Sequence, residues 1–297
     1  MNAALRLLRG QEKDIGGGFT VLRVLPAAQQ RSVGPFVFFD HFGPTLSNGA
    51  REHDVRPHPH IGLATVTYLF AGAMLHHDST GALQRIEPGA INWMTAGRGI
   101  VHSERAPEDL RGGSYPLHGL QLWAALPQAH EDAEPGFSHT AAAAIPELGV
   151  GGAQLRLLIG SVLGHASPVP TLMTTLYLDI RLPADTTITL ESAWAQEMAL
   201  YAPATGFELD GAAITARQMA VLDPAAETYR VASLADAATR VMLIGGDKLD
   251  APRFMWWNFV SSRKERIQQA ADDWAAGRFP PVAGETEFIP LPEKRLV

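Results

Sequence analysis

The chain has 297 residues, of which 46% are hydrophobic and 19% are charged, so it can form one large domain or two of about 150 residues. The formal net charge of -7 argues against a surface that binds duplex nucleic acid, and the absence of cysteine excludes disulfides and metal–thiolate sites. The first residues lack a secretory-signal pattern, and no apolar run is long enough to span a membrane. We therefore expect a cytoplasmic protein that binds neither nucleic acid nor membrane.

Strand-like patterns occur in both halves of the chain. Residues 63–70 are rich in β-branched and aromatic side chains and predict a buried strand, and residues 79–81 (Ser-Thr-Gly) predict a turn. Residues 154–157 and 176–182 alternate between apolar and polar, as half-buried strands do. Asp210-Gly211 lies between two strand-like stretches and is typical of a hairpin turn. Many short strands separated by turns predict an all-β protein.

One helix is predicted near the C-terminus. Ser262 and Glu265 have the spacing of a capping box, and apolar residues recur at helical spacing from Ile267 to Trp274. Gly277 stands where a helix commonly ends. We expect this helix to pack on the outside of the β-structure.

The segment from Pro127 to Pro146 differs from its surroundings, because it is first polar and then alanine-rich, with several prolines. We interpret it as the connection between two β-domains, residues 1–130 and 131–297. Two halves of similar size are compatible with a duplicated fold whose sequences have diverged.

Two short motifs carry side chains that bind metals. His58-Pro59-His60 and His102-Ser103-Glu104 each place two possible ligand side chains at positions i and i+2, which share one face of an extended chain. If the two pairs face each other across a small barrel, they form a site of three imidazoles and one carboxylate, which suits a first-row divalent metal. An octahedral ion would then keep two open positions. A single HxH is equally compatible with structural histidines, but two such pairs favour the metal site.

At these residues the sequence resembles the pirin family of cupin proteins. The matching stretches are 34–43, 57–72, 88–104, 117–127, 241–246 and 277–279. The resemblance covers nearly the whole chain and is more specific in the first half.

The resemblance implies a bicupin, with two β-barrels packed face to face and a metal only in the N-terminal barrel. It implies that His58, His60, His102 and Glu104 hold the ion, for which Fe(II) is expected and Zn, Mn, Ni or Cu are the alternatives. The general cupin pattern has a glutamate at the position of Ala64, so this sequence departs from it there. Glu104 would then be the acidic ligand.

The resemblance also suggests an activity. Several pirin-like proteins are quercetin 2,3-dioxygenases, which implies a small aromatic substrate, cleaved with oxygen and with release of carbon monoxide. Glu104 would act as the catalytic base. His76 and His77 point in opposite directions on a strand, so at most one of them faces the barrel interior. His77 matches a position where pirins commonly have a histidine, so the resemblance makes it the candidate for a contact behind the ligands, with an exposed turn histidine as the alternative. The alternative is a regulatory protein without enzymatic activity, which contains a metal and acts through protein partners.

Overall fold

The computed structural model describes residues 5–15, 19–47, 49, 54–234 and 236–293. The chain divides into two compact units, each assembled from separate segments. Unit 1 comprises Met1–Gln11, Leu22–Phe39 and Ala143–Lys248, and unit 2 comprises Glu12–Val21, Asp40–Ala142 and Leu249–Val297. The predicted division has a single boundary, after residue 130, and places the C-terminal helix in the second domain. The division into residues 1–130 and 131–297 stays a prediction.

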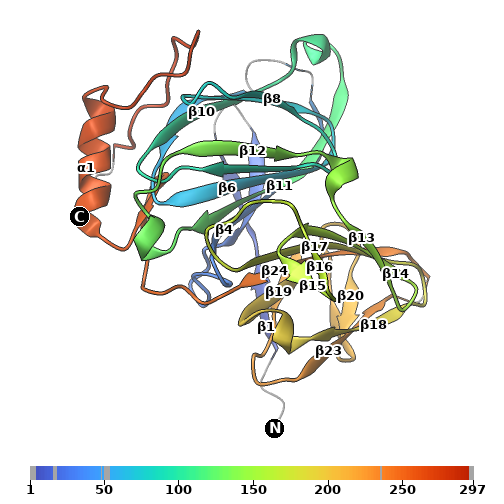
Figure 1. The fold of residues 1–297 in the computed structure, drawn as a ribbon. Coiled ribbons are helices and arrows are strands. Elements are labelled where there is room, and N and C mark those ends of the chain that lie inside the picture. The colour runs from blue at the N-terminus through green and yellow to red at the C-terminus, as the bar shows by residue number, and fades with distance from the viewer. Residues whose placement is uncertain (1–4, 16–18, 48, 50–53, 235, 294–297) are drawn as a thin grey trace. The chain divides into compact units, whose positions relative to one another are not determined.

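Unit 2 contains two large sheets, some of whose strands are labelled in Figure 1. The first has the order β12-β9-β6-β11-β4-β3-β2, and β3 and β4 continue into unit 1. Its strands are β2 (Gln11–Asp14), β3 (Thr20–Leu25), β4 (Phe36–Ser47), β6 (Leu63–Ala71), β9 (Ile91–Thr95), β11 (Tyr115–Ala125) and β12 (Gly136–Thr140). The second sheet has the order β5-β10-β7-β8, with β5 (Val55–His60), β7 (Met74–Asp78), β8 (Leu83–Ile86) and β10 (Ile100–Arg105).

The predicted strand at residues 63–70 is confirmed as β6, and residues 79–81 form the expected turn between β7 and β8. The segment that was interpreted as a linker differs from the prediction. Its middle part contributes β12, which pairs with β9 in unit 2. The connection between domains is therefore shorter than the composition indicated, because polar residues such as Ser138 and His139 can occupy an edge strand.

A helix and a small sheet complete unit 2. The helix α1 spans Lys264–Ala275 and is the red-orange helix of Figure 1. It packs on β25 (Phe254–Trp256) and β26 (Phe259–Ser261) through an apolar cluster. The buried members of this cluster are Ile61, Phe259, Ile267, Ala270 and Ala271.

The predicted ends of α1 have different outcomes. Gly277 has φ +66° and follows the C-cap residue, as expected, because glycine adopts this left-handed conformation without steric cost. The capping box is wrong. The N-cap residue is Arg263, whose side chain makes no capping hydrogen bond, and the Ser262 hydroxyl donates to Glu131 instead. Ser262 therefore bonds to a residue distant in sequence and does not cap the helix.

Unit 1 also contains a seven-stranded and a four-stranded sheet. The larger has the order β1-β22-β19-β24-β17-β14-β13, and the smaller β18-β23-β20-β21. The larger sheet contains β1 (Arg6–Arg9), β13 (Glu147–Val150), β14 (Ala153–Ile159), β17 (Thr175–Leu182), β19 (Glu197–Tyr201), β22 (Gln218–Val221) and β24 (Thr239–Gly246). The smaller contains β18 (Thr187–Glu191), β20 (Phe207–Leu209), β21 (Ala212–Ile214) and β23 (Thr228–Ser233), and β15 (Ser161–Val162) pairs with β16 (His165–Ala166). Seven plus four strands in each unit fit a duplicated fold.

Unit 1 has an apolar interior. Its smaller sheet contributes Ile188, Leu190, Phe207 and Val231 to one buried hydrophobic cluster. Asp210-Gly211 forms the predicted hairpin turn between β20 and β21, with positive φ at both residues. The interior of this unit is therefore packed side chains.

Four short 3-10 helices complete the described elements: η2 (Glu108–Leu110), η3 (Gln128–His130), η4 (Ala142–Ala144) and η5 (Ser192–Trp194). Within the described residues, no helix has the length and apolar character needed to cross a membrane.

Candidate metal centre

The two predicted ligand motifs lie on neighbouring strands of unit 2. His58 and His60 are on β5, and His102 and Glu104 are on β10. These strands pair directly and antiparallel, with His102 opposite His58. The prediction placed the His58/His60 pair and the His102/Glu104 pair opposite each other across a barrel, but in the structure the two pairs lie side by side on one sheet. Residues directly opposite in antiparallel strands have Cβ atoms about 5 Å apart, which brings the imidazoles together.

The three imidazoles form a compact, buried cluster. One potential ligand atom from each of His58, His60 and His102 lies within 4.8 Å of the others. The ring centroid of His58 is 4.9 Å from that of His60 and 4.4 Å from that of His102. None of the three residues is more than 7% exposed. Three nitrogen donors at this separation fit a single first-row metal ion.

Hydrogen bonds fix the orientation of two of these rings. The Nδ1–H of His58 donates to the Arg56 carbonyl oxygen at 2.9 Å, and the Nδ1–H of His60 donates to the Asn258 carbonyl oxygen at 3.1 Å. A carbonyl oxygen only accepts, so in both rings Nε2 carries the lone pair that can bind a metal. The Nε2 of His102 is buried and has no hydrogen-bond partner. A buried nitrogen without a partner is costly unless an ion satisfies it, so the residues present fit a metal.

The environment keeps these imidazoles neutral. Burial lowers the pKa of His58 to about 4, although its hydrogen bond to Arg56 acts in the opposite direction. Burial, and then the charges of the neighbouring histidines, hold the pKa of His60 and of His102 well below the usual value of 6.5. Metal binding requires the neutral imidazole.

Glu104 lies next to this cluster. Between the pairs His102–His58 and Glu104–Val55, β10 has one residue and β5 has two, so β5 carries a bulge and β10 stays regular. Glu104 therefore projects from the same face as His102. It is buried, and burial raises its pKa to about 7. It is not among the side chains whose ligand atoms gather within 4.8 Å, so its role as the fourth ligand stays a prediction.

A second buried pair lies on β7, the other neighbour of β10. His76 Nδ1 is 3.4 Å from His102 Nδ1, and His76 Nε2 is 2.9 Å from an oxygen of Asp78. Burial would raise the pKa of Asp78, but hydrogen bonds from His76 and Thr80 outweigh it and lower the pKa below its usual value.

His77 is the residue predicted to lie behind the ligands, and that role stays a prediction. His76 is the residue that contacts His102, whereas His77 is less buried and lies opposite Ser103 in the strand register. The spacing His76-x-Asp78 repeats the i, i+2 pattern of the two ligand motifs. That pattern was the signal that could have identified the pair from the sequence.

The larger sheet of unit 2 supplies the opposite wall of the site. The Trp123 ring packs edge-on against His60, with centroids 5.1 Å apart, and the Phe137 ring stacks on His76 at 4.2 Å. Strand register places Trp123 opposite Thr65, so Thr65 faces the histidines too. Ala64 therefore points to the other face of β6. Its departure from the general cupin pattern removes no side chain from the site.

The next row of this wall is polar. Strand register aligns Gln121, Thr67, Asn92 and His139 across four strands. The Thr67 hydroxyl donates to Gln121 at 2.8 Å, and His139 Nδ1 donates to the side-chain oxygen of Asn92 at 2.7 Å. The Asn92 Nδ2 amide is buried without a hydrogen-bond partner.

The C-terminal segment covers the other face of β10. Ser103 and Arg105 flank Glu104, and both donate hydrogen bonds to Glu285, at 2.9 and 2.7 Å. The Ile289 N–H donates to the Pro57 carbonyl oxygen at 2.8 Å, which ties the same segment to β5. These two strands, β10 and β5, are thus held from behind by residues 182 and 232 positions later in the chain.

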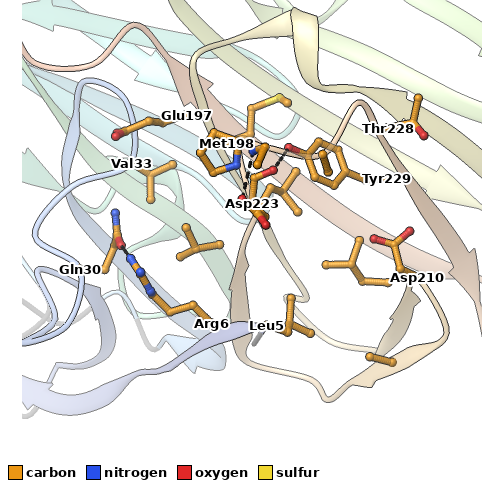
Figure 2. A pocket seen from close by; sticks show the side chains of 17 residues that line it. Leu5, Arg6, Gln30, Val33, Glu197, Met198, Asp210, Asp223, Thr228 and Tyr229 are labelled. Carbon is orange, nitrogen blue, oxygen red and sulfur yellow. Dashed lines mark hydrogen bonds between the residues drawn. The ribbon is translucent and has the colours of Figure 1, made fainter. Parts of the chain in front are cut away.

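Unit 1 contains a separate pocket of about 890 Å³, shown in Figure 2. Its carboxylates already accept backbone hydrogen bonds: Asp210 from Arg230, Asp223 from Ala225 and Glu197 from Gly34. The Tyr229 hydroxyl donates to the Asp223 carbonyl oxygen at 2.7 Å, a bond drawn in Figure 2. These acidic groups stabilise turns, and the pocket contains none of the predicted site residues.

Comparison with known proteins gives consistent matches. The family model described as Pirin matches residues 18–124, and the model described as Pirin C-terminal cupin domain matches residues 177–280. A pirin-like protein of Caulobacter vibrioides is 45% identical over 95% of this chain and 97% of its own length.

Solved structures also match. Quercetin 2,3-dioxygenase from Acinetobacter baumannii has a TM-score of 0.87 and 32% identity, covering 98% of this chain and 97% of that one. A bacterial pirin of Escherichia coli in complex with nickel(II) has a TM-score of 0.65 and 15% identity, covering 82% of this chain and 100% of that one, a likeness that shows the fold alone. Because the two family models match successive parts of the chain and a close relative spans nearly all of it, this chain belongs to the pirin family and has two cupin domains.

Proposed function

We propose that this protein is a metal-dependent dioxygenase that opens an aromatic ring with molecular oxygen, with a flavonol such as quercetin as the substrate class. The observation that carries the proposal is the buried cluster of His58, His60 and His102, whose ligand atoms lie within 4.8 Å of one another. The 32% identity to a solved quercetin 2,3-dioxygenase supports the reaction type. We assign one ion per chain to this cluster, with Glu104 as the fourth ligand and Fe(II) as the metal.

The proposed metal supplies Lewis acidity toward a substrate hydroxyl and, as Fe(II), redox chemistry toward oxygen. The protein supplies the rest of the site. Two imidazoles are held by backbone carbonyls, so they keep their orientation whether or not substrate is present. Glu104 is the carboxylate on the ligand face of β10 and is assigned as the base that accepts the proton of the substrate hydroxyl.

The wall opposite the ligand strands is suited to an aromatic substrate that also carries oxygen atoms. Trp123 contacts His60 and offers an aromatic surface beside the ligands. Asn92 offers an N–H donor without a partner, which suits a carbonyl or phenolic oxygen. An aromatic diol or flavonol has both an aromatic ring to pack against Trp123 and oxygen atoms to accept from Asn92. A purely aliphatic substrate lacks the ring.

The experiment combines metal analysis with oxygen uptake. Protein loaded with Fe(II) without oxygen is mixed with aerated quercetin, and oxygen consumption is followed together with the loss of quercetin absorbance. We expect about one iron per chain and oxygen consumption that requires quercetin. His58→Ala should lose both, whereas His165→Ala, which changes an exposed histidine of unit 1, should retain both.

One outcome separates the two alternatives. Full iron occupancy without oxygen uptake on a panel of flavonols and aromatic diols would reject the dioxygenase proposal. It would favour the regulatory alternative, in which a metal-containing pirin acts through a protein partner. The cytoplasmic location stays a prediction.

A further inference from the structure

The three imidazoles of the cluster can bind one ion only if each presents a bare nitrogen to it. For His58 and His60 a backbone carbonyl fixes the tautomer, because the carbonyl oxygen can only accept. The Nδ1 of His102 faces another imidazole instead, that of His76, at 3.4 Å. An imidazole nitrogen can be a donor or an acceptor, so the tautomer of His102 depends on what fixes His76.

Asp78 fixes His76. One carboxylate oxygen of Asp78 accepts from the Thr80 N–H at 2.8 Å, the Thr80 hydroxyl at 2.6 Å and the Ala82 N–H at 3.2 Å. The other oxygen is 2.9 Å from His76 Nε2, and Asp78 is fully buried. A carboxyl group that already accepts three hydrogen bonds on one oxygen is held as the carboxylate, which only accepts, so His76 Nε2 carries a hydrogen.

The direction of the next contact follows. In a neutral His76 with its hydrogen on Nε2, Nδ1 is an acceptor, so the facing Nδ1 of His102 must donate. The hydrogen of His102 is then on Nδ1, which leaves Nε2 bare. That nitrogen is the buried atom without a partner. The ring of His76 is held in this position by Phe137, which stacks on it at an interplanar angle of 15°.

We propose that Asp78 and His76 are positioning residues that hold His102 as the tautomer with a bare Nε2 and thereby direct this imidazole to the metal. The inference rests on the metal site proposed above. A carboxylate behind a metal-bound histidine is a common arrangement that raises the basicity of the ligand. Here one additional imidazole stands between the carboxylate and the ligand, so His102 differs from the two ligands that are backed by carbonyls.

His102, His76 and Asp78 form a relay of two hydrogen bonds in which His102 donates to His76 and His76 donates to Asp78. Replacing Asp78 by asparagine should reverse the direction of both hydrogen bonds. The Thr80 and Ala82 donors would keep the asparagine side-chain oxygen, so its NH₂ group would face His76. His76 Nε2 would then accept, its Nδ1 would donate to His102, and the hydrogen of His102 would move to Nε2. His76→Phe removes the relay but keeps a ring against Phe137, so it is the second variant if Asp78→Asn does not fold.

The test uses two readouts. Nitrogen chemical shifts of metal-free protein labelled with ¹⁵N-histidine report which nitrogen of His102 is protonated, with the signals assigned by comparison with His102→Gln. Competition with a chelator measures affinity for Fe(II) and for Zn(II). Loss of a group that orients a metal ligand costs about 10- to 100-fold in affinity, and we expect that loss for Asp78→Asn and for His76→Phe.

Thr80→Ala is the matched control, because it removes one hydrogen bond to the same carboxylate and leaves the bond to His76. It should retain the tautomer of His102 and the affinity. A wild-type His102 protonated at Nε2, or an affinity that falls equally in Thr80→Ala and Asp78→Asn, would overturn the inference. If the wild type binds no metal, the proposed function fails, while the tautomer readout still decides this inference.

Discussion

The buried carboxyl of Glu104 leads to a prediction in which stability and metal binding change in opposite directions. Its pKa is about 7 in the folded protein and 4.5 without the fold. A raised folded-state pKa means that stability is fully present below pH 4.5 and is lost as the pH rises through 7. At about 1.36 kcal/mol per pKa unit, burial of the charged carboxylate costs the metal-free protein about 3 kcal/mol above that pH.

Glu104→Gln keeps the size of the side chain and removes the charge. In the presence of a chelator, we expect this variant to be more stable than the wild type by about 3 kcal/mol at pH 9 and about equally stable near pH 4. Its affinity for divalent metal should fall if Glu104 is the acidic ligand that we propose. Urea unfolding followed by tryptophan fluorescence reports mainly on unit 2, because Trp194 is the single tryptophan among the six that belongs to unit 1.

Glu131→Gln is a matched control with the opposite sign. Glu131 is also buried, but it pairs with Arg253 and accepts hydrogen bonds from Ser261 and Ser262. Its replacement should destabilise unit 2, because the buried Nε of Arg253 loses the charge of the facing carboxylate, while Asp250 still pairs with Nη2 of the same guanidinium. A stability difference for Glu104→Gln that is the same at pH 5 and pH 9, or full retention of metal affinity, would refute the reasoning.

Two further predictions concern the backbone and the C-terminal segment. Gly62→Ala should destabilise unit 2 by more than about 2 kcal/mol in urea unfolding, because Gly62 has φ +67° and an added Cβ would lie 1.9 Å from the Val260 oxygen. Gly81→Ala is the control and should destabilise unit 2 less, because Gly81 has φ +94° but an added Cβ would meet no atom within 4 Å. Equal losses of stability in the two variants would contradict this prediction. Glu285→Gln should speed hydrogen exchange at the Ile289 amide, with a loss of about 1 kcal/mol. The Arg105 hydrogen bond lowers the pKa of Glu285, so this contribution is present above about pH 4.5 and is lost as the pH falls through the lowered value; unchanged exchange in the variant at pH 7 would contradict the assignment.

The sequence by itself determined the local features of this protein. The β-branched and aromatic composition of residues 63–70 predicted β6, a period of two predicted β17, and Asp210-Gly211 predicted a hairpin turn. These patterns depend on neighbouring residues and backbone sterics. The same period showed that His58 and His60 share a face, which brought the main ligands of the candidate site within reach of the sequence alone.

Only the tertiary structure decided which segments meet. Three contacts join residues that lie 26 to 182 positions apart in the sequence. They are the pairing of β5 with β10, the contact of His102 with His76 rather than His77, and the contact of Glu285 with the back of β10. The predicted cap at Ser262 failed for the same reason, since Glu131 is a partner from another part of the chain. Such contacts are set by strand pairing and burial over the whole unit, and a pattern that repeats every two residues contains no information about which strand will lie alongside.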